Sequence, residues 1–173
     1  METFLKTVGN LLPYHLLSYG ALLGTELYQS FVNTKICYQT LPMKEFIVLQ
    51  KRLFPIYFGT QVGLTALTAA THPPYSIISL VKDPWSAVPL AIVALTGCLN
   101  WFLYGPRTIT ASLVRRALQE SENTSSDSDG SKLHRANRDF ARNHAMTIHL
   151  NAIAMIATVV YGFSLSGTLI GDA

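Results

Sequence analysis

The chain has 173 residues, of which 49% are hydrophobic and only 13% are charged. That length suits one domain, and a soluble domain usually carries about 25% charged residues. The composition therefore argues against an ordinary soluble protein and for lipid as the main solvent. The net charge of +3 is mild, and the aromatic residues lie inside apolar runs instead of beside basic clusters. We expect no nucleic-acid binding, which needs a concentrated basic face.

Four segments are long and apolar enough to cross a bilayer, which takes about 20 helical residues. In chain order they cover residues 11–32, 53–71, 86–105 and 145–170. Pro55 would fall in the first turn of the second helix, where its missing N–H costs little. A soluble bundle would need charges on every exposed face, yet these segments contain one acidic residue, Glu26, and no Lys or Arg. The sequence predicts an all-α integral membrane four-helix bundle, formed by residues 1–173 as a single domain.

Basic residues are concentrated in two of the connections between these segments. Eleven of the 13 Lys and Arg residues lie either between the first and second helices or between the third and fourth. In a four-helix topology these two connections share one side, and the positive-inside rule assigns that side to the cytoplasm. Both termini then lie on the non-cytoplasmic side. We expect the protein in the eukaryotic endomembrane system, with the mitochondrial outer membrane as the alternative.

The connection between the third and fourth spans has three parts. Residues 106–119 have the pattern of a basic amphipathic helix that continues the third span or lies at the interface, against anionic lipid. Residues 121–131, SENTSSDSDGS, are rich in Ser, Asp and Glu and are expected to form a short disordered linker. Residues 132–143 are again basic and are compatible with a helix that leads into the fourth span.

Polar residues recur at helical spacing within all four spans, and lipid cannot satisfy their hydrogen bonds. They should therefore face the inside of the bundle. Glu26 is the most informative of them, because an ionisable residue in a span is a functional candidate by default. The alternative is structural, since buried amides often only join helices, at about 0.6 kcal/mol per bond. The candidate polar interior site comprises Glu26, His15, Gln61, Asn100, His144 and Asn151.

Small residues four positions apart mark two further helix faces. Gly20 and Gly24 lie on the first helix, and Gly59 and Gly63 lie on the second. Such spacing lets helix backbones approach closely. We therefore expect tight helix contacts at these glycines, within the bundle or between two copies in a homodimer.

The helix ends on the predicted cytoplasmic side carry the most specific residue patterns. They are Phe31-Val32, Leu41-Pro42, Leu53-Phe54-Pro55-x-Tyr57-Phe58, Asn100-Trp101, Gly105-Pro106-Arg107-Thr108 and His149-Leu150-Asn151. This series, in this order, resembles the transmembrane protein 205-like family over nearly the whole chain. The resemblance implies a four-helix membrane domain of a kind found widely in eukaryotes, and it implies no particular reaction.

The sequence bears on three classes of function, of which it favours two. A non-enzymatic scaffold or adaptor fits the large basic surface, with the lipid bilayer, anionic lipids and a membrane protein or second copy as partners. The alternative is a small transporter or transporter accessory that uses Glu26. An enzyme is not expected, because the sequence contains no phosphate-binding loop, nucleophile elbow or paired carboxylates.

We expect no cofactor and no metal. The two cysteines, Cys37 and Cys98, have no metal-binding spacing. His15, His144 and His149 leave metal or haem binding as a minor alternative, although they form no ligand spacing such as H-x-x-x-H.

Overall fold

The computed structural model describes residues 8–122 and 130–171, and every regular element within these ranges is a helix. The predicted all-α class is confirmed. Residues 123–129 of the predicted linker lie outside the described ranges, whereas Ser121 and Ser131 belong to the helices on either side. The linker boundaries at 121 and 131 were therefore too wide, because a few polar residues can extend a helix that ends in water.

The first long helix begins at Leu11, after an N-cap in which the Asn10 side chain accepts a hydrogen bond from the Leu12 N–H at 2.9 Å. It runs as α2 (Leu11–Leu27), continues as the π-helical segment η1 (Tyr28–Asn33) and ends as α3 (Thr34–Thr40). The predicted start at residue 11 is confirmed, but the predicted end at residue 32 is wrong. Apolar composition marks only the part of a helix that lipid surrounds, so a polar continuation into water escapes it.

The second long helix, α4 (Met43–Ala70), begins directly after Pro42 and not at residue 53. Pro55 therefore lies inside the helix, and its predicted place in the first turn is wrong. The added turns hold Lys44, Glu45, Lys51 and Arg52, which are too polar for a membrane segment. Lys, Glu and Arg are nevertheless good helix formers, so the segment is helical without being apolar.

The second half of the chain begins with the short helix α5 (Ile77–Lys82), followed by α6 (Pro84–Leu99), the π-helical segment η2 (Asn100–Tyr104) and α7 (Gly105–Glu122). Asp83 caps α6 by accepting a hydrogen bond from the Trp85 N–H at 3.1 Å, and Pro84 occupies the first position. The predicted amphipathic helix at 106–119 thus continues the third span. The last helix, α8 (Gly130–Gly171), begins well before the predicted residue 145 and includes the basic segment 132–143.

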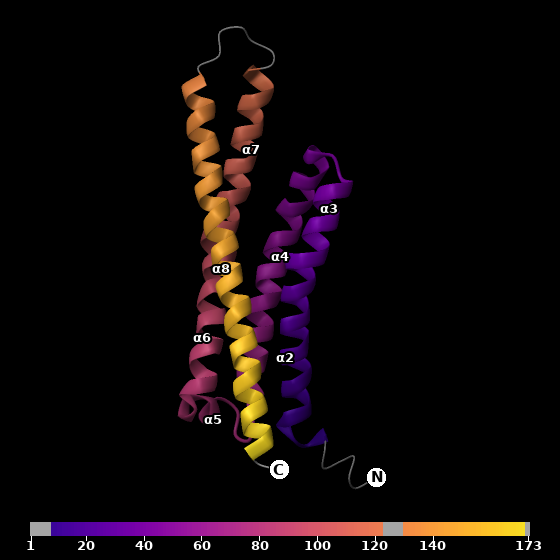
Figure 1. The fold of residues 1–173 in the computed structure, drawn as a ribbon, viewed down its shortest axis with the longest axis vertical. Helices are drawn as coiled ribbons and strands as arrows, with labels where there is room; N and C mark the ends of the chain where they lie inside the picture. The colour runs from indigo at the N-terminus through magenta and orange to yellow at the C-terminus, as the bar shows by residue number, and fades with distance from the viewer. Residues whose placement is uncertain (1–7, 123–129, 172–173) are drawn as a thin grey trace.

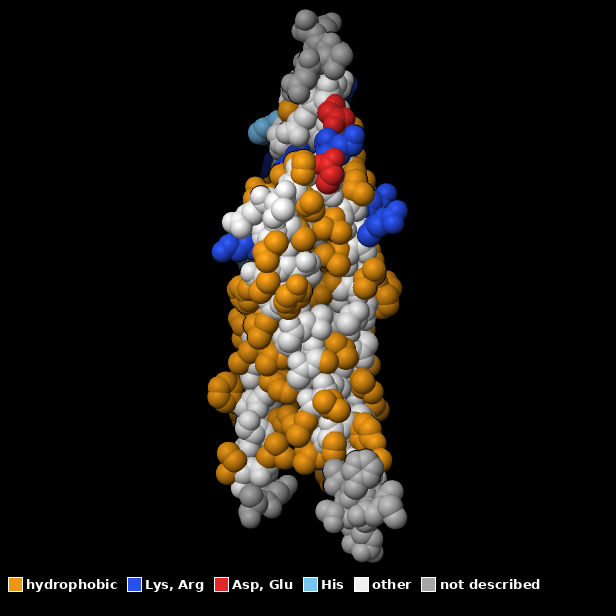
Figure 2. Space-filling model, turned by 90° about the vertical axis from the view of Figure 1, so that its right-hand side faces the viewer, with side chains coloured by type: hydrophobic (Ala, Val, Ile, Leu, Met, Phe, Trp, Pro, Cys, Tyr) orange, Lys and Arg blue, Asp and Glu red, His pale blue; other side chains and the backbone are white. Residues whose placement is uncertain are grey.

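Figure 1 shows the long helices lying side by side along one axis. The α3–α4 turn and the adjoining ends of α7 and α8 lie at one end, whereas α5 and the first and last described residues lie at the other. The two basic connections therefore share one end, as predicted. Figure 2 shows Lys and Arg side chains gathered towards this basic end, while hydrophobic side chains cover most of the remaining visible face.

Three described helices are long and apolar enough to cross a membrane: Met43–Ala70, Pro84–Ser121 and Gly130–Gly167. α2 alone has 17 residues, but it continues into η1 and packs against α4 and α8. Large apolar side chains such as Leu17, Ile56 and Phe163 are exposed on the outside of the assembly. Such a surface suits lipid, so the described chain is an all-α membrane helical bundle.

The centre of the bundle consists of two clusters of buried apolar side chains. One joins Leu22, Val93, Ala154 and Ala157, and the other joins Leu80, Leu90, Tyr161 and Leu165. Each cluster draws residues from both α6 and α8. The small alanines on α8 let these two helices approach closely.

Only one of the four predicted packing glycines meets a neighbouring helix within the described chain. Gly59 lies against the Trp101 ring, where a Cβ would approach to 3.2 Å, whereas a Cβ at Gly20, Gly24 or Gly63 would meet no described atom within 4 Å. The predicted contact within the bundle is therefore wrong for these three, which lie on exposed helix faces. Contact between two copies stays a prediction. The sequence pattern could not separate an outward face from an inward one.

Gly97 lies outside the predicted glycine pattern, yet its surroundings are slightly tighter than those of Gly59. A Cβ there would lie 3.1 Å from Val62 Cγ2 and 3.3 Å from Gln61 Oε1. We predict that Gly97→Val lowers the free energy of unfolding by about 1–3 kcal/mol, because the larger side chain must push α6 away from α4. The measurement is denaturant unfolding of the purified protein in detergent micelles.

Gly63→Val is the matched control, because it introduces the same side chain on an exposed face of α4. We expect it to leave the monomer's stability nearly unchanged. Equal losses in both variants would contradict the packing described here. A specific loss of dimer in Gly63→Val would support the predicted contact between copies.

Candidate functional site

One fully buried polar contact in the bundle joins Glu26 on α2 to Gln61 on α4. Both side chains are fully buried, and Gln61 Nε2 donates a hydrogen bond to Glu26 Oε1 at 2.7 Å. Glu26 Oε2 and Gln61 Oε1 are buried as well, and within the described ranges neither makes a hydrogen bond of ordinary length. Among the described residues, no Lys, Arg or His pairs with Glu26. The predicted inward position of Glu26 is therefore correct, and of the other predicted site residues Gln61 makes a hydrogen bond to it.

Asn100 makes a second contact, between the third and fourth spans. Its Nδ2 donates to the backbone oxygen of Thr147 at 3.2 Å, and the hydroxyls of Thr147 and Thr108 lie 3.1 Å apart. The Asn100 side-chain oxygen is buried without a partner. The group thus holds α8 against the junction of η2 and α7, and it leaves one acceptor free inside the bundle.

Asn151 is the centre of a third contact, which links three helices. It accepts a hydrogen bond from the Tyr57 hydroxyl at 2.7 Å and donates to Ser30 Oγ at 2.8 Å. Tyr57 lies on α4 and Ser30 on η1. Since Asn151 lies on α8, one amide side chain joins the first, second and fourth long helices.

His15 lies at the opposite end of α2 from Glu26, about 16 Å away along the helix axis at 1.5 Å per residue. Its Nε2 lies 2.6 Å from the Tyr161 hydroxyl and its Nδ1 lies 3.3 Å from Thr71 Oγ1. The ring of His72 meets its edge, with centroids 5.5 Å apart. The structure therefore separates His15 from the other predicted site residues.

His72, which follows the end of α4, was missed by the sequence analysis. Burial lowers the pKa of His72, and the nearby Asp83 carboxylate opposes that shift. A signal was present in the sequence, because His15 and His72 occupy the same end of adjacent antiparallel helices. The described residues contain no group of three His, Cys, Asp or Glu that could hold a metal ion.

His144 also lies apart from Glu26, at the basic end. Its ring stacks on Phe140 of the same helix with centroids 5.2 Å apart. It lines a cleft between the α3–α4 hairpin and the α7–α8 hairpin, which we call the hairpin cleft. This cleft has a volume of about 440 Å³, and its polar walls include Gln50 and Arg115. The six predicted site residues thus fall into separate groups along the bundle and form no single site.

Two π-helical segments lie beside the buried polar groups. η1 begins two residues after Glu26, and η2 begins at Asn100. In each, a backbone N–H donates to the carbonyl oxygen five residues earlier, as from Thr34 to Gln29. Segments of this kind frequently occur at functional sites. The turn at η2 also restricts residue 105 to glycine, since a Cβ at Gly105 would lie 2.5 Å from the Asn100 carbonyl oxygen.

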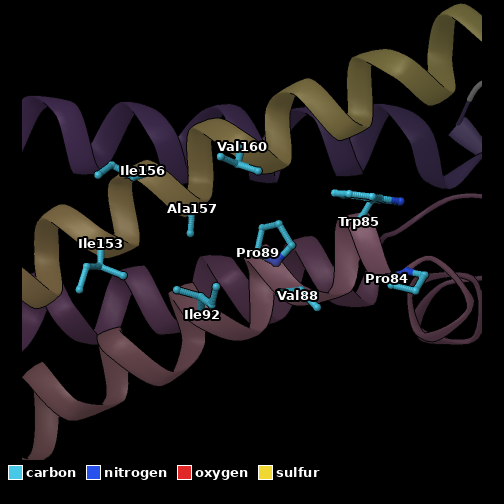
Figure 3. Close-up of a pocket in the computed structure, with 9 residues that line it drawn as sticks. All are labelled: Pro84, Trp85, Val88, Pro89, Ile92, Ile153, Ile156, Ala157 and Val160. Atoms are coloured by element: carbon cyan, nitrogen blue, oxygen red, sulfur yellow. The ribbon is translucent and has the colours of Figure 1, made fainter.

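A further groove lies between α6 and α8 near α5 (Figure 3). Its volume is about 480 Å³, and every lining residue is apolar: Pro84, Trp85, Val88, Pro89, Ile92, Ile153, Ile156, Ala157 and Val160. Figure 3 shows these side chains projecting between the two helices. The groove offers no polar group to orient a ligand, so it is a weaker candidate site than the hairpin cleft.

Long apolar helices, a lipid-compatible surface and polar groups turned inward define a multi-pass α-helical membrane protein. Residues 17–117, more than half of the chain, match a family model described as "Domain of unknown function (DUF4149)". The chain also matches "Xanthocillin biosynthesis cluster protein D" of Aspergillus fumigatus, with 58% identity over 170 residues that cover 98% of each protein. The chain belongs to the DUF4149 family. No solved structure matches it.

The Glu26–Gln61 contact generates a prediction about stability. Gln61→Leu removes the hydrogen-bonding partner of a buried carboxyl group, so we expect it to lower the free energy of unfolding by about 1–3 kcal/mol. Glu26→Gln retains a hydrogen-bonding group of the same shape and should cost clearly less. The measurement is unfolding of both variants in detergent micelles.

The control is Thr60→Leu, which also replaces a polar residue of α4 by leucine but on an exposed position. We expect little change from it. If Gln61→Leu were as stable as Thr60→Leu, the contact would contribute nothing to the bundle.

Proposed function

We propose that this protein is a non-enzymatic membrane scaffold or adaptor that serves a biosynthetic pathway. The observation that carries the proposal is the placement of polar groups. Within the spans, the most polar side chains are fully buried in contacts between helices, whereas the polar-lined cleft opens at the basic end. The name of the Aspergillus relative, a biosynthesis cluster protein, supports the choice of pathway.

The buried contacts favour a structural role for the interior. Glu26, Gln61 and Asn100 each bond to a residue of another helix and are closed off from solvent. A transporter needs a path that water or solute can enter. These contacts instead account for the polar residues as links between helices, which is the role that such residues usually have in membranes.

The basic end provides the interaction surface that a scaffold needs. Two helical hairpins, α3–α4 and α7–α8, lie at this end (Figure 1). By the positive-inside rule we place this end in the cytoplasm and both termini on the opposite side. Anionic lipid headgroups and acidic surfaces of a protein partner complement its charge. An endomembrane location, or alternatively the mitochondrial outer membrane, is compatible with this orientation.

Transport is the second candidate, and a separate observation favours it. Glu26, Gln61 and Asn100 each carry one buried oxygen without a partner, and both π-helical segments lie beside them. Unpartnered acceptors could take up a cation or proton in another conformation of the bundle. The two candidates differ in whether the charge of Glu26 is needed.

We also propose that the DUF4149 family and the transmembrane protein 205-like family are one group. The matched region, residues 17–117, contains most of the residue patterns that carry the resemblance, from Phe31 to Thr108. The same patterns lie at the basic ends of the long helices in the structure. This overlap is what supports the link.

The test of function is complementation of a deletion strain of the organism that produces the protein, read out as its metabolite profile. We expect Glu26→Gln to restore the wild-type profile at matched membrane levels. A quadruple charge reversal, Lys44→Glu, Lys51→Glu, Arg138→Glu and Arg142→Glu, should fail. Failure of Glu26→Gln with success of the charge reversal would reject the scaffold and favour transport.

The orientation is tested by labelling single cysteines in a Cys37→Ser, Cys98→Ser background. Lys44→Cys and Arg138→Cys should react with a membrane-impermeant maleimide added from the cytosol, because both positions are exposed at the basic end. Ile78→Cys on α5, also exposed, should react only after the membrane is permeabilised fully. The reverse pattern would contradict the proposed orientation.

A further inference from the structure

We propose that the hairpin cleft is a binding site for a small amphipathic anion, a carboxylate or phosphate group carried on an apolar body. The cleft brings together aromatic walls, a guanidinium whose buried Nε has no hydrogen-bond partner among the described residues, and a buried amide that has none there either. A scaffold needs no such ligand, so this inference goes beyond the function proposed above.

The shape of the cleft suits a single small molecule. Its volume of about 440 Å³ falls in the range of about 300–1,000 Å³ that ligand pockets occupy. Its walls come from four helices, α3, α4, α7 and α8, so it exists only where the two hairpins face each other. Apolar and aromatic side chains form much of the lining, among them Phe46, Phe54, Ile109 and Phe140.

Gln50 is the strongest sign that something polar belongs in the cleft. Its side chain is only 5% exposed, yet in the part of the chain that the structure describes neither its amide nitrogen nor its amide oxygen has a hydrogen-bond partner. Buried polar groups in folded proteins are nearly always paired. A ligand that carries an acceptor would satisfy the Gln50 N–H groups, which the protein alone does not.

Arg115 determines the sign of the ligand's charge. Its buried Nε has no hydrogen-bond partner, and its guanidinium carbon lies 4.2 Å from the centre of the Phe140 ring. The residues that line the cleft include no Asp or Glu and no other Lys or Arg. A guanidinium held in this way prefers a carboxylate or phosphate, to which it can donate two parallel hydrogen bonds.

The cleft also has a direction. Thr108 lies near the junction of α7 with η2, and Arg115 lies about two helical turns further out along α7. The anionic group of a ligand would therefore lie at Arg115, and its apolar body would lie deeper, beside Phe54 and Ile109.

The test uses full-length protein purified in a neutral detergent and two fluorescent probes that differ only in charge. We expect 1-pyrenebutyrate to bind saturably and 1-pyrenebutanol to bind at least about tenfold more weakly, which corresponds to one charge-assisted hydrogen-bonded contact. Arg115→Gln should reduce pyrenebutyrate affinity at least about tenfold. Gln50→Leu should reduce it by a smaller factor.

Arg116→Gln is the matched control, because Arg116 is the next residue, pairs with Glu120 at 2.8 Å and does not line the cleft. It should bind pyrenebutyrate like wild type, and it corrects for partition of the probe into micelles. Equal affinity for the two probes, or equal effects of Arg115→Gln and Arg116→Gln, would overturn the proposal. If Arg115→Gln does not fold, Ser112→Asp is used instead, because it places a carboxylate on the cleft wall. It must weaken the binding of pyrenebutyrate and leave the binding of pyrenebutanol unchanged.

A competition experiment distinguishes the source of the anion. The protein is placed in nanodiscs of phosphatidylcholine, with and without phosphatidylserine, and titrated with pyrenebutyrate. Loss of binding with phosphatidylserine would identify a lipid headgroup as the ligand, and unchanged binding would point to a soluble anion. Failure of all binding would remove this site but leave the complementation test of the scaffold unaffected.

Discussion

The absence of water between the lipid chains is the constraint on which this structure depends. A polar side chain in a span finds no partner in hydrocarbon, so it must find one within the protein, on its own helix or on a neighbouring one. The chain meets this constraint with single contacts placed at different depths. Glu26–Gln61 joins α2 to α4, Asn100–Thr147 joins η2 to α8, and Tyr57–Asn151–Ser30 joins three helices at once. The polar residues thus define which helices are neighbours, while the apolar clusters fill the space between them.

This arrangement separates two kinds of polar chemistry. In the apolar part of the bundle, the most polar side chains, Glu26, Gln61 and Asn100, are buried and hydrogen-bonded to other helices. Charged groups at the basic end are many and mostly exposed, whereas Gln50, Thr108, Ser112 and the Nε of Arg115 are buried at the hairpin cleft. A ligand or partner can reach the second set without any opening of the bundle. For that reason the basic end, and not the interior, is where we place recognition.

The sequence predicted the helices by their apolar stretches and the inward faces by their polar spacing, as at Glu26, Gln61 and Asn100. The predictions failed for helix ends, for the direction of glycine faces and for contacts between distant residues, because hydropathy and spacing do not report them. The extensions of α4 and α8 into water have a polar composition that hydropathy excludes, although their residues form helices well. The glycine pattern at Gly20 and Gly63 gave no information about which way a face points. Gly97 and His72 acquire their roles from neighbours distant in sequence, and the hairpin cleft exists only once two hairpins face each other.

The π-helical segments have a consequence for how the chain can change over time. Each widens one turn by a single residue, so the residues that follow are rotated by about 100° relative to an uninterrupted α-helix. η1 lies between α2 and α3, and η2 lies between α6 and α7, so each interrupts a long helix before its extension towards the basic end. Each segment therefore sets how the part of the helix that follows it is rotated about the helix axis relative to the part that precedes it. Loss of one residue in either segment would turn the outer half to a new face while the inner half kept its contacts. Single-residue insertions and deletions at these two positions are thus a direct route by which relatives could redirect their basic ends without rebuilding the bundle.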